Sequence, residues 1–435
     1  MNKIRLKPRP LDIGDKTGFG EHDLFKRKDF ADGLTNLMKN IEDPTVFLLD
    51  APWGDGKTTF LKQWSGELRL SGVHVIEFDA FLRDYQDDPF IALSAEIFAA
   101  AQKEESLEEI TRADFIERAK SLGKASLSII AKVAINKLSS GAISLEDFEE
   151  SGEVPMDDAS AILEERLKAA EADAELLFSF RESLEKLAKG MSTDEGTPLV
   201  LIVDELDRCR PSFAVELIEK IKHVFSVPGV HFVLSAHLPQ LAKIFQNTYG
   251  LGGEEQALNY LEKFYDVRVK FPTPPPWSAT ITRSYIERLW YELNLLPTDI
   301  HSPANFRDAL ECIFQNRQVS LRTIEKIMTN IALYYAGISS RDGESFILVT
   351  GICCFRHCAP ELYEKIASSN VTLDDINGFF GFDSWPQDNT SSLIREHWRY
   401  IFGEGVNSDP KNSSVSQGKA NDLLSKIASQ IDNFH

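Results

Sequence analysis

The stretch APWGDGKTT, residues 51–59, decides how this chain folds. It follows the apolar run VFLL at 46–49, which is typical of a buried strand, and it precedes FL at 60–61, where a helical pattern begins. A glycine-rich turn between a strand and a helix presents backbone N–H groups at a helix N-terminus, where the partial positive charge favours an anion. The stretch therefore predicts a phosphate-binding loop.

The residue types in this loop indicate nucleotide phosphates. Lys57 adds a mobile cation that can reach the β- and γ-phosphates, and the Thr58 hydroxyl is placed to ligate the Mg²⁺ that bridges them. The same motif predicts that further loop residues contact the nucleotide: Trp53, Gly54, Asp55, Gly56 and Thr59.

Ala51 departs from the usual spacing GxxxxGKT, in which a glycine stands first. The Cβ of alanine disfavours a positive φ, so we expect Ala51 to keep an ordinary conformation and Gly54 to supply the bend. A phosphate loop by itself fits kinases, switches and motors alike, so a second motif has to separate them.

The second motif supplies carboxylates. The apolar run LVLIV at 199–203 is typical of a strand buried on both faces of a parallel sheet, and it ends in Asp204 and Glu205. We expect Asp204 to hold Mg²⁺ through a water and Glu205 to orient or deprotonate the attacking water. This pattern favours hydrolysis of ATP, because a kinase would also need an acceptor site and the sequence shows no signature of one.

The stretches DELDRCRP at 204–211 and WGDGKT at 53–58 resemble two signatures of the KAP family of P-loop NTPases. FKRKDFADGL, FDAF and LNYLEKFYDVRVKFP are similar to further segments of the family, and the resemblance extends over residues 20–335. It implies an ATPase that uses Mg²⁺. Bacterial members of the family are often associated with phage exclusion and antiviral defence beside partner proteins, and the resemblance extends that expectation to this chain.

Three positions depart from the family pattern. Glu205 replaces the usual second aspartate and keeps a carboxylate suited to a hydrolytic base. His237 stands where an aspartate is common, and Phe81 replaces a tryptophan. For this reason the family's sensor chemistry is not carried over to these two positions.

Strand-like runs at 46–49, 73–78, 199–203 and 230–235 alternate with helical patterns, and a run at 267–271 is expected to extend the sheet. This order predicts an α/β fold of the P-loop NTPase type, with a parallel sheet whose ligand binds at the carboxyl ends of the strands.

About 110 residues separate the second strand from the third, far more than a crossover needs. We therefore predict a large helical insertion at about 100–190, because residues 161–190 carry apolar side chains at helical spacing. The acidic segment at 145–160 is expected to be mobile. The insertion either contacts a partner protein or packs on the core, and the pattern leaves both open.

The proline-rich stretch FPTPPPW at 271–277 is expected to end the core, because consecutive prolines lack N–H donors and disfavour helix. The predicted parts are an N-terminal arm at 1–19, a P-loop NTPase core at 20–275, and an α-helical lid and C-terminal region at 276–435. The resemblance implies that the lid supplies a basic residue to the nucleotide. Arg322 is the first candidate and Arg317 the second, against the alternative of a solvated surface arginine.

Arg208 follows the second motif and leaves two hypotheses open. In the first hypothesis, Arg208 acts on the nucleotide of an adjacent subunit, where an arginine can raise the rate of phosphoryl transfer by ~10³- to 10⁵-fold. Alternatively, it forms an ion pair with Asp207 that holds its own loop. No sequence pattern reveals a subunit interface.

The chain of 435 residues carries a formal net charge of −20, so nucleic-acid binding is not expected. The basic residues of the first nine positions form either an arm for an acidic partner or a frayed tail. Five cysteines do not make a disulfide framework and no leader pattern is present, so we expect a cytoplasmic protein. The cluster at Cys353, Cys354 and Cys358 is expected to lie in a core; the alternative is a zinc site, which the lack of a second CxxC or HxxxH motif disfavours.

Many members of the KAP family carry membrane helices between the two motifs. The corresponding segment here, LSIIAKVAINKL at 127–138, is interrupted by two lysines and is shorter than the ~20 apolar residues of a membrane span. We therefore expect no contact with a membrane.

Our first hypothesis is an ATPase that binds ATP and Mg²⁺ and converts nucleotide state into motion of the insertion and the lid. We expect it to act as a homo-oligomer with protein partners at the insertion or lid. The alternative is a nucleotide-gated adaptor with negligible turnover. A nucleic-acid motor is a third possibility, which the charge disfavours and a steep salt dependence of DNA binding would support.

Overall fold

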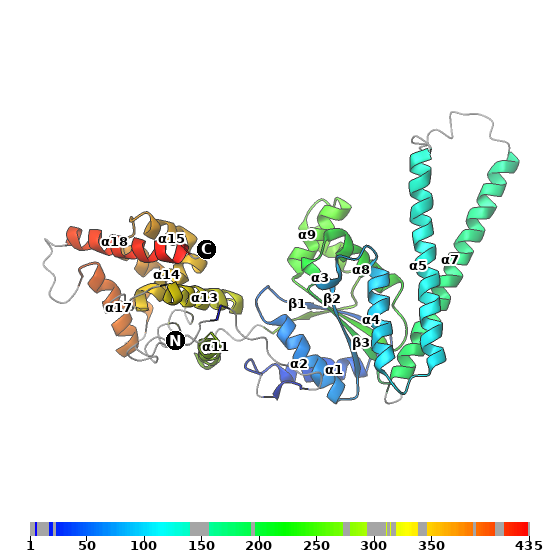
Figure 1. The fold of residues 1–435 in the computed structure, drawn as a ribbon, viewed down its shortest axis with the longest axis horizontal. Helices are drawn as coiled ribbons and strands as arrows, with labels where there is room; N and C mark the ends of the chain where they lie inside the picture. Colours follow the sequence, from blue (N-terminus) through cyan, green and yellow to red (C-terminus); the bar gives the residue numbers. More distant parts are fainter. Residues whose placement is uncertain are drawn as a thin grey trace.

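A computed structural model of the chain describes residues 5–6, 17–20, 23–139, 156–192, 196–272, 279–293, 310, 314, 319–337, 346–385, 389–404 and 413–433. Figure 1 shows a central lobe built on a sheet, a long helical hairpin on one side of it and an all-helical lobe on the other. The observed fold class is α/β, as predicted, with a parallel sheet, a helical insertion and a helical C-terminal region.

Five parallel strands form the sheet in the order β2-β3-β4-β1-β5. Their bounds are β1 (Val46–Asp50), β2 (His74–Asp79), β3 (Leu199–Asp204), β4 (Val230–Ala236) and β5 (Val267–Lys270). All five strand-like runs of the sequence are therefore confirmed, with ends that differ by about one residue. Because the strands are parallel, their carboxyl ends meet at one edge, where Asp79 lies in register with Asp204.

Helices cover both faces of the sheet. Phe47 and Leu49 of β1 belong to the apolar cluster beneath α1 (Lys28–Lys39) and α2 (Lys57–Leu70). Val46 and Leu48 point the other way, because successive strand residues alternate. They belong to the larger cluster formed with α4 (Pro89–Lys103), α8 (Pro211–His223), α9 (Leu238–Tyr249) and α10 (Glu254–Leu261). The result is a three-layer sandwich with a core on each face of the sheet.

The insertion is an antiparallel hairpin of α5 (Glu109–Ser139) and α7 (Met156–Met191), which projects from the central lobe (Figure 1). Its base is fixed by aromatic packing: the Phe180 ring lies 5.6 Å from that of Phe115, 5.1 Å from that of Phe90 and 5.5 Å from that of Phe225. The base therefore packs on the core. Of the acidic segment at 145–160 that is expected to be mobile, residues 145–155 lie outside the described residues.

The C-terminal lobe has a core of its own, around side chains such as Tyr334, Phe355 and Trp398. Its helices are α11 (Ala279–Glu292), α13 (Leu321–Gly337), α14 (Phe346–Cys358), α15 (Pro360–Ala367), α16 (Leu373–Phe380), α17 (Asn389–Ile401) and α18 (Ser413–Asp432). Cys353 and Cys354 are fully buried in it, as expected of core cysteines. Among the described residues, no group of three or more His, Cys, Asp or Glu side chains is arranged to hold a metal.

The described residues of the N-terminal segment make contacts with both lobes. The Arg5 N–H donates to the Leu293 carbonyl at 3.0 Å, and Thr329 Oγ1 donates to the Leu6 carbonyl at 3.0 Å. Phe19 is buried, with its ring 5.8 Å from that of Phe60 in α2. None of the helices in the described ranges combines the length and apolarity that a membrane span requires.

Candidate functional site

The phosphate-loop candidate connects β1 to α2, and its glycines set its course. Gly54 and Gly56 have φ values of 90° and 80°, whereas Ala51 is not among the described residues with positive φ. A Cβ added at Gly54 would also lie 2.9 Å from the Cβ of Arg322, so both conformation and space require glycine there. The expectation that Ala51 keeps an ordinary conformation and Gly54 supplies the bend is confirmed.

The two polar residues that begin α2 contact the ends of β1 and β3. Lys57 Nζ donates to the carbonyls of Ala51 at 2.6 Å and Pro52 at 3.3 Å. Burial lowers the pKa of Lys57, an effect that the charges of nearby aspartates oppose. Thr58 Oγ1 donates to Asp204 Oδ2 at 2.7 Å. The structure thus brings together the two residues that the sequence predicts as Mg²⁺ ligands.

Glu205 follows β3 in an uncommon backbone conformation. Its φ of 58° and ψ of 27° lie in the left-handed region, which costs a residue with a Cβ about 1 kcal/mol or more. The Glu205 N–H donates to Asp204 Oδ1 at 2.8 Å, which holds this turn. Burial raises the pKa of the Glu205 carboxyl, Arg208 opposes that rise, and Asp204, Asp79 and Asp207 add to it.

Arg208 pairs with Glu205 and not with Asp207. Its Nη1 lies 2.5 Å from Glu205 Oε1, and its side chain is 40% exposed. The Asp207 carboxylate is buried and accepts a hydrogen bond from Trp53 Nε1. The proposed ion pair between Asp207 and Arg208 is therefore not the one that forms, while the action of Arg208 on another subunit stays a prediction.

Trp53 links the phosphate loop to two neighbouring strand ends. Besides its bond to Asp207 after β3, its ring lies 5.5 Å from that of His237, which follows β4. The histidine that stands where the family often has an aspartate thus packs against the loop tryptophan.

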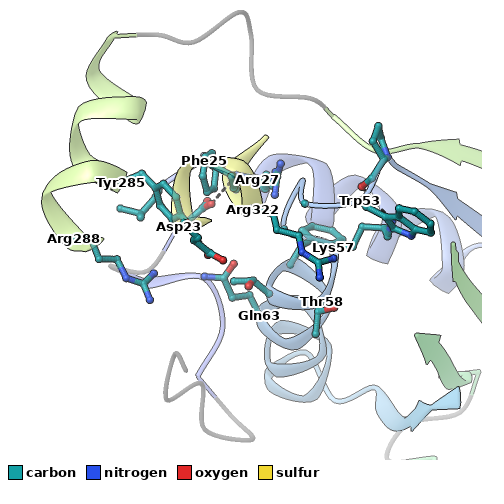
Figure 2. A pocket seen from close by; sticks show the side chains of 18 of the residues that line it. Asp23, Phe25, Arg27, Trp53, Lys57, Thr58, Gln63, Tyr285, Arg288 and Arg322 are labelled. Carbon is teal, nitrogen blue, oxygen red and sulfur yellow. Dashed lines mark hydrogen bonds between the residues drawn. The ribbon is translucent and has the colours of Figure 1, made fainter. Parts of the chain in front are cut away.

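A cavity of about 430 Å³ lies between the phosphate loop and the C-terminal lobe. The predicted residues Trp53, Gly54, Gly56, Lys57, Thr58 and Thr59 line it, together with Arg208 and Arg322. In Figure 2 the Arg322 side chain, from the start of α13, extends toward Lys57 and Thr58. Arg317, the second candidate, lies outside the described residues.

Asp55 is the predicted loop residue that does not line this cavity. Its Oδ2 is buried and has no hydrogen-bond partner among the residues that the structure describes. Burial raises the pKa of Asp55, and Arg27 is the first of the charges that oppose the rise. Asp55 therefore lies near Arg27, which packs beneath the phosphate loop, and not at the surface of the cavity.

Sequence reasoning missed the residues that wall the cavity from the other sides. Before α1 these are Asp23, Leu24, Phe25 and Arg27, and from the C-terminal lobe they include Tyr285, Arg288, Leu289 and Glu325 (Figure 2). No spacing rule connects them, because they come from segments far apart in the chain.

Arg27 is the most buried cation at the site, with 5% of its surface exposed. Its guanidinium lies over the rings of Phe271 at 4.1 Å and Phe25 at 4.8 Å, and burial lowers its pKa to about 10. A Cβ at Gly56 would lie 3.3 Å from Arg27 Nη1, so the side chain lies directly under the phosphate loop. In the sequence Arg27 stands between Lys26 and Lys28, and no pattern distinguishes it from these two basic neighbours.

One comparison with known protein families agrees with this geometry. Residues 27–338 match the P-loop domain of the KAP family. No curated protein matches the chain. Among solved structures, the ORC2 protein of Aeropyrum pernix in its ADPNP-ADP complexes shares 11% identity at a TM-score of 0.35, covering 98% of each chain. Its ADP form shares 10% identity at a TM-score of 0.33, covering 97% of this chain and 96% of that one.

Proposed function

The chain belongs to the KAP family of P-loop NTPases, and from this premise we propose that it binds ATP with Mg²⁺ and hydrolyses it. The observation that carries the proposal is the 2.7 Å hydrogen bond from Thr58 to Asp204. It joins a loop hydroxyl to a strand-end carboxylate beside a glycine-rich turn. Both side chains offer oxygen, the ligand type of Mg²⁺, which in such sites uses one or two carboxylates together with substrate phosphates. The residues present therefore fit the metal.

The phosphates would lie at the N-terminus of α2, where backbone N–H groups favour anions. Lys57, now held by the Ala51 and Pro52 carbonyls, would turn to them. Arg322 would add a second cation from the lid. The apolar and aromatic side chains of Phe25, Tyr285 and Leu289 would receive the base at the other end of the cavity.

For hydrolysis, Thr58 and Asp204 would hold Mg²⁺, which supplies positive charge against the charge of the transferring phosphoryl. Glu205 would accept a proton from the attacking water. Its raised pKa suits that task, because a base whose pKa lies closer to the working pH takes a proton more readily. Phosphate release beyond one equivalent per chain, in excess ATP and Mg²⁺, tests this proposal.

The second candidate function is a nucleotide-gated adaptor without appreciable turnover. The ion pair between Glu205 and Arg208 favours it, because a carboxylate held by a guanidinium is a poorer base for water. Release of no more than one phosphate per chain, unchanged by Glu205→Gln and by candidate partners, would select the adaptor.

We further propose that nucleotide state is transmitted to protein partners or to further copies of the chain, in the cytoplasm. What supports this is that the cavity is walled by the core and the lid together, so that a ligand would change how they pack. The role in antiphage defence rests on the family resemblance. Molecular mass with and without a non-hydrolysable ATP analogue tests the assembly, and phage challenge of cells with and without Glu205→Gln tests the defence role.

A further inference from the structure

Arg208 holds Glu205 through both its side chain and its backbone. The short helix Leu206–Arg208 places the two side chains three residues apart, with Arg208 Nη1 2.5 Å from Glu205 Oε1. The Arg208 N–H also donates to the Glu205 carbonyl at 3.1 Å. The Glu205 side chain is only 19% exposed, so this ion pair is partly shielded from water.

The same arginine lines the cavity beside Lys57 and Thr58. These two residues mark where the terminal phosphate of a bound nucleotide would lie. A guanidinium binds phosphate oxygens in a bidentate manner, and a γ-phosphate carries more negative charge than one carboxylate. Arg208 therefore has two possible anionic partners within the reach of one side chain.

The backbone around the pair is fixed from two sides. Asp204 Oδ1 accepts the Glu205 N–H at 2.8 Å, and Trp53 holds Asp207 to the phosphate loop. An exchange of partners by Arg208 would therefore need a rotation of its half-exposed side chain and no rearrangement of the loop.

We propose that Arg208 acts within its own subunit as a positioning residue that senses the γ-phosphate. Without a γ-phosphate it holds the Glu205 carboxylate, and a bound γ-phosphate draws it away and frees that carboxylate for water. ADP leaves the pair intact because it lacks the third phosphate. This inference rests on the proposed function and adds a control on when the base is available.

The test measures nucleotide binding rather than turnover. Dissociation constants for a non-hydrolysable ATP analogue and for ADP, each with Mg²⁺, are measured by calorimetry for four proteins: wild type, Glu205→Gln, Arg208→Ala and the double variant. Because the γ-phosphate has to break the ion pair in the wild type, Glu205→Gln should tighten analogue binding. Repulsion between Glu205 and phosphate acts with or without Arg208. The effect of Glu205→Gln on affinity is therefore compared in the protein with Arg208 and in Arg208→Ala, and the difference isolates the ion pair.

The gain in analogue affinity from Glu205→Gln should be about fivefold larger with Arg208 present than with Arg208→Ala, while ADP shows no such difference. Equal gains in both backgrounds, or the same difference for ADP, would overturn the inference. Arg208→Met, which keeps the stem without the charge, replaces Arg208→Ala if that variant unfolds. If the wild type binds neither nucleotide, the proposed function fails and takes this inference with it; binding of both without coupling overturns the inference alone.

Discussion

Trp53 Nε1 donates a hydrogen bond to Asp207 Oδ2, and this bond joins the phosphate loop to the segment that carries Glu205. Asp207 is 5% exposed, whereas Trp53 is 43% exposed, so the buried partner depends on the exposed one. The loop that would bind phosphate and the residue that would activate water are thereby held in one arrangement.

Trp53→Phe keeps an aromatic ring beside His237 and removes the donor. A buried acceptor that loses its hydrogen bond costs about 1–3 kcal/mol, so we expect the free energy of unfolding to fall by that amount in urea titrations. Tyr400→Phe, at a side chain 75% exposed, is the control and should change nothing. Equal stabilities of Trp53→Phe and the control would show that the bond does not hold the loop.

Ala51 and Gly54 have opposite backbone requirements: Gly54 has a positive φ and Ala51 does not. Ala51→Gly adds backbone freedom where none is needed and should lower stability by about 0.5–1 kcal/mol, with nucleotide affinity within about twofold of wild type. Gly54→Ala places a Cβ at φ 90° and against Arg322, and should weaken nucleotide binding about tenfold or more. Binding by the two variants, measured by calorimetry, should fall in this order; the reverse order would mean that the turn begins at Ala51.

Much of this architecture is readable from the sequence because it follows local rules. Apolar runs predict the strand before the glycine loop and the strand before Asp204 and Glu205, and parallel pairing of both with β4 brings their ends to one edge. Arg322 follows only from the family resemblance, because its place beside Gly54 depends on how the two lobes pack. The partners of Arg208, Asp207 and Arg27 could not be predicted, because a choice between neighbouring carboxylates or a burial beneath a loop is decided by tertiary contacts without a spacing rule.

Arg322→Ala should weaken ATP binding about tenfold, because a cation that faces the phosphates would be lost. Lys326→Ala is the matched control, since Lys326 is exposed one turn further along α13 and does not line the cavity. Affinities from calorimetry that are equal for the two variants would return Arg322 to the role of a solvated surface arginine.

The pH dependence of kcat/KM should report Glu205 in the free protein. Hydrolysis needs the ionised carboxylate, and burial raises its pKa above the ordinary 4.5, so the acid limb should lie above that value. Arg208 opposes the rise, so Arg208→Ala should move the limb to higher pH, whereas Arg208→Lys keeps the charge and should move it less. A limb that stays in place in Arg208→Ala would assign it to another group.

The central claim is that Glu205 activates water for ATP hydrolysis, and multiple-turnover phosphate release tests it most directly. Glu216 offers a matched control, because burial also raises its pKa but it lies in α8, where the charges that act on it are those of Lys220, Asp88 and Glu219 rather than those of Asp204 and Arg208. We expect many phosphates per chain from the wild type and from Glu216→Gln, and a rate about 10²- to 10⁴-fold lower from Glu205→Gln with ATP still bound. Equal rates from the two glutamine variants, or a wild type that releases no more than one phosphate per chain, would contradict the account.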